Sequence, residues 1–132
     1  MSESPVSALG AMLSGMSPKL DDRPYSFALL DEGEQIPDFA FAFAVIRENE
    51  GTTVVLPKEQ AESQFARITL QVHSDLEGVG LTAAVSAALA KAGIACNVIA
   101  GYYHDHLFVP WERRDEAMTL LIALSEKPRG GG

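Results

Sequence analysis

The sequence has few of the residues that mark several common classes of protein. Its 132 residues include one cysteine, Cys96, which excludes an internal disulfide. Cys96 lies in an apolar strand pattern, so we interpret it as a buried, inert thiol in a reducing compartment. Basic residues are also scarce, since 10 Lys and Arg face 18 Asp and Glu. The net charge of −8 disfavours nucleic acid and anionic lipid as partners.

Long apolar runs are absent as well. No stretch approaches the roughly 20 apolar residues that a membrane-spanning helix needs. The first residues lack the basic start and continuous apolar segment of a secretion signal. We therefore expect a cytoplasmic protein with no membrane partner. The 47% hydrophobic content is enough for the core of one domain or of two very small ones.

The spacing of the apolar residues predicts an α+β protein. The stretch 39–46 is apolar on both faces, which is typical of a central, covered strand. Gly51 is expected to take a positive φ in a hairpin turn, and Gly93 to end a helix with Ile94 packed beyond it. Alternation predicts strands over 25–30, 39–46, 52–56, 68–72, 96–103 and 106–109, and helical spacing predicts helices over 4–13, 57–64, 81–92 and 112–126.

Two segments of the chain resemble each other. "VVLPKEQAE" (54–62) and "LFVPWERRDEA" (107–117) both read as a strand, a proline and the start of a Glu-containing helix. We interpret this as a faint internal repeat. It predicts two similar halves whose sheets pack side by side.

A glycine-rich stretch, "HSDLEGVGLTAAV" (73–85), lies between a predicted strand and a predicted helix. A dinucleotide loop would need an acidic residue about 20 positions on, where Val98 stands instead. An amino-acid loop fits better, because backbone N–H groups at a helix N-terminus favour a carboxylate, and Asp75 and Glu77 suit an ammonium group. The third interpretation is a tight turn with a capping box made by Ser74 and Glu77.

The segment "DLEGVGLTAAVSAALAKAGIACNVI" resembles the ACT domain, a ferredoxin-like βαββαβ regulatory module. With "AGYYHDHLFVPWER" it is similar to stand-alone bacterial ACT-domain proteins, which have two ACT-like halves in tandem. The resemblance covers residues 66–124 well and the first 60 residues weakly. Aligned on "AGI" (92–94), Gly80 matches the loop glycine and Glu77 the acidic position, whereas Val79 replaces the usual proline and Thr82 the leucine.

This resemblance implies a domain division and a ligand site. The halves would be 1–64 and 65–127, followed by a disordered tail, 128–132. ACT domains pair through their sheets and bind amino acids or other small ligands where one domain's loop meets its partner's strands, which implies a homodimer. The implicated positions are Asp75, Glu77, Gly78, Val79, Gly80, Leu81, Asn97, Val98 and Ile99.

Other chemistry is weakly supported by the sequence. His104 and His106 flank Asp105 in a predicted hairpin turn, and the three are possible metal ligands only if the strand is regular there. Ser74 beside His73 lacks the acid and oxyanion hole of a catalytic triad. We therefore expect a non-catalytic, amino-acid-binding regulatory module without a cofactor. The alternatives are a structural or protein-interaction module without a ligand and a metal-dependent enzyme around the two histidines.

Overall fold

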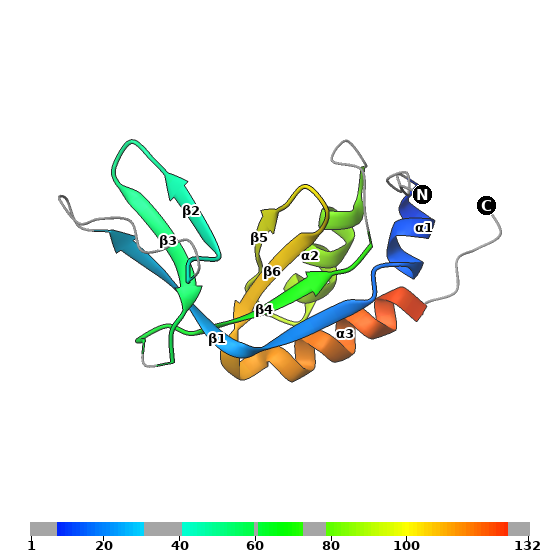
Figure 1. The fold of residues 1–132 in the computed structure, drawn as a ribbon. Coiled ribbons are helices and arrows are strands. Elements are labelled where there is room, and N and C mark those ends of the chain that lie inside the picture. Colours follow the sequence, from blue (N-terminus) through cyan, green and yellow to red (C-terminus); the bar gives the residue numbers. More distant parts are fainter. Residues whose placement is uncertain (1–7, 31–40, 60, 73–78, 127–132) are drawn as a thin grey trace.

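The computed structural model describes residues 8–30, 41–59, 61–72 and 79–126. They form one six-stranded antiparallel sheet and helices, which confirms the predicted α+β class (Figure 1). In chain order the elements are α1 (Leu9–Ser14), β1 (Pro18–Leu30), β2 (Ala44–Arg47), β3 (Thr52–Pro57), β4 (Phe65–Leu70), α2 (Leu81–Lys91), β5 (Asn97–Ala100), β6 (Asp105–Pro110), a 3-10 turn η1 (Trp111–Arg113) and α3 (Arg114–Glu126).

The sheet is organised around the long strand β1. The strand order is β2-β3-β1-β4-β6-β5, so β1 and β4 lie at the centre. The C-terminal part of β1 pairs with β3 and its N-terminal part with β4, with a register shift between Leu20 and Pro24. A single strand therefore belongs to both halves of the sheet.

The repeat seen in the sequence has a counterpart in this register. Pro57 pairs with Tyr25, Tyr25 with Phe65, and Phe65 with Pro110. The two prolines thus end β3 and β6 at matching positions on either side of the central pair. This arrangement is consistent with tandem halves.

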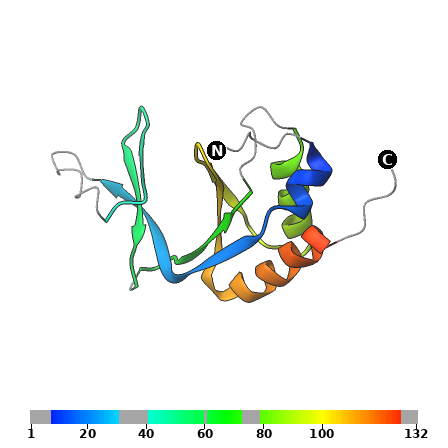
Figure 2. The ribbon, with the colours of Figure 1, turned by 45° about the vertical axis from the view of Figure 1, so that its right-hand side comes forward.

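The three helices cover one face of the sheet beside β4 and β6, as Figures 1 and 2 both show. Alternate strand residues on this face, such as Ile68, Leu70 and Leu107, are almost fully buried. They pack with Leu81, Val85 and Leu89 of α2, with Ala117 and Leu121 of α3, and with Met12 and Met16. This helix-side core contains most of the buried apolar side chains of the described residues.

The opposite face of the sheet is concave and carries a second, aromatic core. Phe43, just before β2, lies 5.6 Å from Phe108 of β6, measured between ring centroids. In a flat sheet four strand spacings would separate those strands by about 19 Å. The sheet must therefore curl strongly about β1. The rings of Tyr25 and Phe27 also contact Phe108, and the ring of Phe65 contacts that of Phe27.

This curvature explains why the prediction of a central strand over 39–46 was wrong. Only Ala44–Arg47 forms a strand, β2, and it lies at one edge of the sheet. Residues 39 and 40 are outside the described residues. Phe43 of this apolar segment packs instead against Tyr25 and Phe108 on the concave face.

Three further local predictions were wrong. Residues 57–59 and 61–64 form no helix, because this polar stretch offers too little apolar surface to bury. The strand predicted over 25–30 begins earlier than predicted, because β1 starts at Pro18. The hairpin turn of residues 48–51 is present, but Gly51 does not have a positive φ. A Cβ there would lie 2.9 Å from Leu29 Cδ1, the end of an exposed side chain that can move aside, so the position does not require glycine.

The predicted end of α2 is confirmed. Gly93 has a φ of +73° and donates its N–H to the Ala90 carbonyl, while Ile94 donates to the Leu89 carbonyl and is buried. These two hydrogen bonds define a Schellman cap.

Gly93→Val is expected to lower the free energy of unfolding by about 1–2 kcal/mol, because a β-branched residue is strained at a left-handed position. The control is Gly10→Ala in α1, where a Cβ would meet no atom within 4 Å and φ is not in the left-handed region. That change should be neutral or stabilising. Urea unfolding curves for both variants check the difference, and equal losses would contradict the cap.

Candidate functional site

The described part of the glycine loop ends in an unusual helix start. Gly80 is the N-cap of α2 with a φ of +103°, and no side chain among the described residues caps the helix. The alternative of a capping box made by Ser74 and Glu77 falls on residues outside the described part of the chain, and α2 itself begins at Leu81. Val79 is 82% exposed beside it. Asp75, Glu77 and Gly78 lie outside the described residues.

The helix α1 approaches this loop closely. A Cβ at Gly80 would lie 3.2 Å from Leu9 Cδ2. Glycine is therefore favoured both by its backbone conformation and by the space available. Leu81, the next predicted site residue, is 3% exposed and belongs to the helix-side core.

The predicted site residues of β5 divide between the two faces of the sheet. Val98 pairs with Leu107 and packs against the helix-side core. Asn97 and Ile99 pair with Phe108 and His106 on the concave face. Within one chain, the described members of the predicted set therefore do not converge on a single site.

A polar cluster that sequence reasoning missed lies on the concave face beside the aromatic core. Lys19, Thr69 and His106 are direct neighbours across β1, β4 and β6. They line a cavity of about 320 Å³ together with Asp21, Arg67, Gln71 and His104. The alternation of Arg67, Thr69 and Gln71 with buried apolar residues was the signal in the sequence that this strand has a polar face.

Arg67 is the best-anchored residue of this polar cavity. Its Nη2 lies 2.8 Å from Asp21 Oδ2, and its guanidinium lies 4.5 Å from the Phe43 ring centroid and 5.2 Å from that of Tyr25. Burial alone would raise the pKa of Asp21, but hydrogen bonds from Arg23, Arg67 and Tyr25 outweigh it and hold this pKa well below its usual range. Asp21 is therefore ionised and paired at neutral pH.

The two histidines share this cavity, although they come from a turn and a strand. His106 Nδ1 lies 3.0 Å from Thr69 Oγ1, and His104 Nδ1 lies 3.5 Å from the Val72 carbonyl oxygen. Burial, followed by the positive charge of Arg67 and the proximity of His104, lowers the pKa of His106. Among the described residues no three His, Cys, Asp or Glu side chains are grouped to hold a metal ion.

Acidification should therefore destabilise the protein through His106. The pKa of His106 is lower in the folded state than in the unfolded state. The contribution of the neutral imidazole to the free energy of unfolding is therefore complete above about pH 6.5 and is lost as the pH falls below that value. Between about pH 7.5 and pH 5.5 the wild type should lose more unfolding free energy than His106→Asn does. Denaturant melts at the two pH values check this, and equal losses would contradict the assignment.

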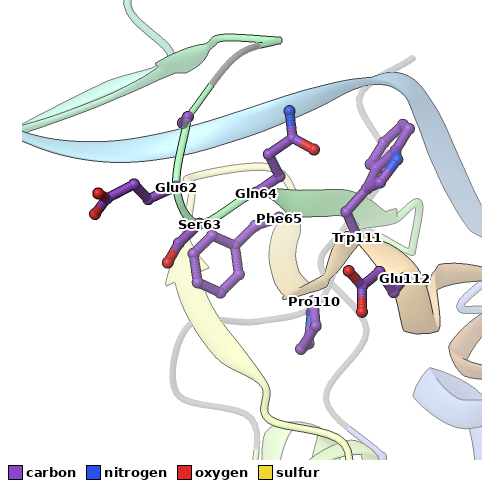
Figure 3. A pocket seen from close by; sticks show the side chains of 8 residues that line it. Glu62, Ser63, Gln64, Phe65, Pro110, Trp111 and Glu112 are labelled. Atoms are coloured by element: carbon purple, nitrogen blue, oxygen red, sulfur yellow. The ribbon is translucent and has the colours of Figure 1, made fainter.

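A second cavity, also of about 320 Å³, lies where β4 begins and β6 ends (Figure 3). Phe65, Pro110 and Trp111 supply its apolar lining, and Glu62 and Glu112 stand at opposite ends of the group in this view. Trp111 packs against the helix-side core with the Arg114 guanidinium 3.9 Å from its ring centroid.

Cys96 does not contribute reactive chemistry here. It is partly buried against the helix-side core, and burial raises the pKa of its thiol. The thiol is therefore protonated at neutral pH, which agrees with the interpretation of an inert cysteine.

Comparison with known proteins identifies the family. ACT-domain family profiles match residues 4–70 and 62–123, and the two matches overlap on the central strand β4. The chain belongs to the ACT-domain family. ACT domains are regulatory, non-catalytic modules that typically bind small molecules and often dimerise.

Two solved structures are similar over most of the chain. A Vibrio cholerae protein of unknown function, described as a possible transport protein, is 43% identical, with a TM-score of 0.73 over 86% of this chain and 92% of that one. An Agrobacterium tumefaciens protein shares the fold, with 19% identity and a TM-score of 0.67 over 87% of this chain and 96% of that one. Among curated proteins, no match was found.

None of the described helices is both long enough and apolar enough to cross a bilayer.

Proposed function

We propose that the protein is a non-catalytic, cytoplasmic regulatory module that binds an amino acid as a homodimer. The ligand would lie between the loop before α2 of one chain and β5 of the other. The observation that carries the proposal is the start of α2, where Gly80 adopts a left-handed conformation and no side chain of the described ranges caps the helix.

An uncapped helix start offers its N–H groups to a carboxylate. The charge at such an end stabilises an anion by about 0.3–1 kcal/mol, and by more where the site is partly buried. Asp75 and Glu77 precede Gly80 in the sequence and would answer the ammonium group. An amino acid carries both charges, whereas a nucleotide diphosphate would be repelled by the two acids.

The division of β5 between two faces supports a dimeric site. β5 is the last strand in the sheet order, so its outer edge has no partner strand within the described residues. Such an edge is suited to pairing with a second sheet. A partner's loop placed at this edge would meet Asn97 and Ile99.

Gly80→Asp tests the proposal. It should abolish amino-acid binding, because a side chain and a negative charge would occupy the carboxylate position. Gly80→Asn is the matched control, since both residues tolerate a left-handed φ but only Asp adds charge. Asn should weaken binding less than Asp. The measurement is calorimetric titration with the amino acid that raises the melting temperature, beside NAD and ATP.

Binding of either nucleotide, or equal amino-acid affinity in the wild type and Gly80→Asp, would refute the assignment. Failure to bind any of these compounds would favour the second candidate, a protein-interaction module. That candidate is supported by the exposure of Leu29 and Phe41, each 69% accessible.

A further inference from the structure

We propose that the polar cavity on the concave face is a second ligand site, which binds a small molecule through an oxyanion group, a carboxylate or a phosphate. Its central group is the Arg67 guanidinium, assisted by Lys19 and Thr69. Within one chain this cavity lies on the opposite side of the sheet from Gly80, the loop position of the proposed amino-acid site, which is at the start of a helix.

The charge of the cavity is opposite to that of the chain. Lys19 and Arg67 bring two positive charges to a cavity in which Asp21 is the one acidic residue among the described lining residues, whereas the whole chain carries −8. Lys19 makes no ion pair with the described residues. Cations gathered in a concave site attract anions even when the net charge of the protein is negative.

Asp21 does not offer its carboxylate to a ligand. Its oxygens accept hydrogen bonds from the Arg23 backbone N–H and side chain, from the Tyr25 hydroxyl and from Arg67, over distances of 2.8 to 3.2 Å. A carboxylate with so many donors has little capacity left for an ammonium group. The cavity is therefore suited to an anion, which distinguishes its ligand from an amino acid.

Arg67 is held in place before any ligand binds. The rings of Phe43 and Tyr25 and the ion pair with Asp21 fix the plane of the guanidinium. Its Nε is buried and makes no hydrogen bond to the described residues, and its sole described hydrogen bond uses Nη2. A rigid guanidinium with unused donors is well suited to bind an oxyanion, because little side-chain entropy is lost.

The other lining residues add donors of the same kind. Gln71 accepts a hydrogen bond from the Ser17 hydroxyl through Oε1, which leaves its amide N–H groups as donors. Thr69 lies between Lys19 and His106 in the register. The volume of about 320 Å³ is at the lower end of the range for small-molecule sites, which indicates a compact ligand.

The test uses the full-length protein without a histidine tag, titrated with succinate and, separately, with inorganic phosphate in a low-chloride buffer. Binding is followed by calorimetry and by the NMR signal of the Arg67 Nε–H. Lys19→Met should weaken binding about tenfold, the loss expected for one charged hydrogen bond. The matched control Lys58→Met removes the same charge outside the cavity lining and should leave affinity unchanged.

Thr69→Val provides a second variant that keeps the charge and should also weaken binding. Gly80→Asp should bind both probes as the wild type does, so failure of the amino-acid site and failure of this site are distinguishable. Preference for succinate would identify a carboxylate site and preference for phosphate a phosphate site. No binding of either probe, or equal weakening by Lys19→Met and Lys58→Met, would overturn the proposal.

Discussion

Phe108→Ala is expected to lower the free energy of unfolding by about 3–5 kcal/mol, the range for deleting a fully buried aromatic ring. Phe108 is 0% exposed, and its ring contacts those of Tyr25, Phe27 and Phe43. These residues come from segments that meet only because the sheet curls. Truncation would remove the ring that holds the two halves of the concave face together.

Chemical denaturation of Phe108→Ala and Phe41→Ala measures this effect against a matched control. Phe41 is 69% exposed, so its removal should change stability by no more than about 0.5 kcal/mol. Losses of similar size in the two variants would mean that the aromatic core does not stabilise the fold in solution. The curled sheet would then be wrong.

Asp21→Asn is expected to cost about 3 kcal/mol, because it leaves the partly buried Arg67 without its counter-ion. The side chains of Asp21 and Arg67 are 13% and 21% exposed, and the amide of asparagine cannot accept as many hydrogen bonds as the carboxylate. Asp22→Asn is the control, since the side chain of Asp22 is exposed and the substitution changes the charge by the same amount. Thermal and urea unfolding should show a small loss for this control.

The stabilisation by the ion pair of Asp21 and Arg67 should also make the wild type sensitive to acid. The pKa of Asp21 is well below its ordinary value of 3.8 in the folded state. The stabilisation is therefore fully present above that value and is lost as the pH falls through the lower, folded pKa. Asp21→Asn should lose less stability than the wild type below about pH 4. Parallel acid-unfolding curves would contradict the pairing.

Local patterns in the sequence were sufficient to predict the helices of the C-terminal half and the C-terminal cap of α2. Ala117 and Leu121 recur at helical spacing and are buried as that spacing requires. The left-handed Gly93 followed from its place between the helix and Ile94. Pro57, at the end of β3, favoured the prediction of a helix over 57–64, as Pro110 does for the last helix. That prediction was wrong because the residues beyond Pro57 lack a comparable apolar stripe.

The concave face was not predictable from sequence patterns. Asp21 and Arg67 are 46 residues apart, and Thr69 and His106 are 37 apart, so no local motif joins them. Their meeting depends on the strand order and on the bend of β1 at the register shift. The alternation along β4 predicts that one side of the strand is polar, but not which residues of the neighbouring strands lie beside those polar side chains.

The central claim is that this ACT-domain protein binds an amino acid. The most direct measurement is the melting temperature of the wild-type protein with each of the common amino acids in turn. The account predicts that at least one raises it, corresponding to about 2.7 kcal/mol of added stability at 100 times its dissociation constant. A protein whose melting temperature is unchanged by every amino acid at millimolar concentration would contradict the claim.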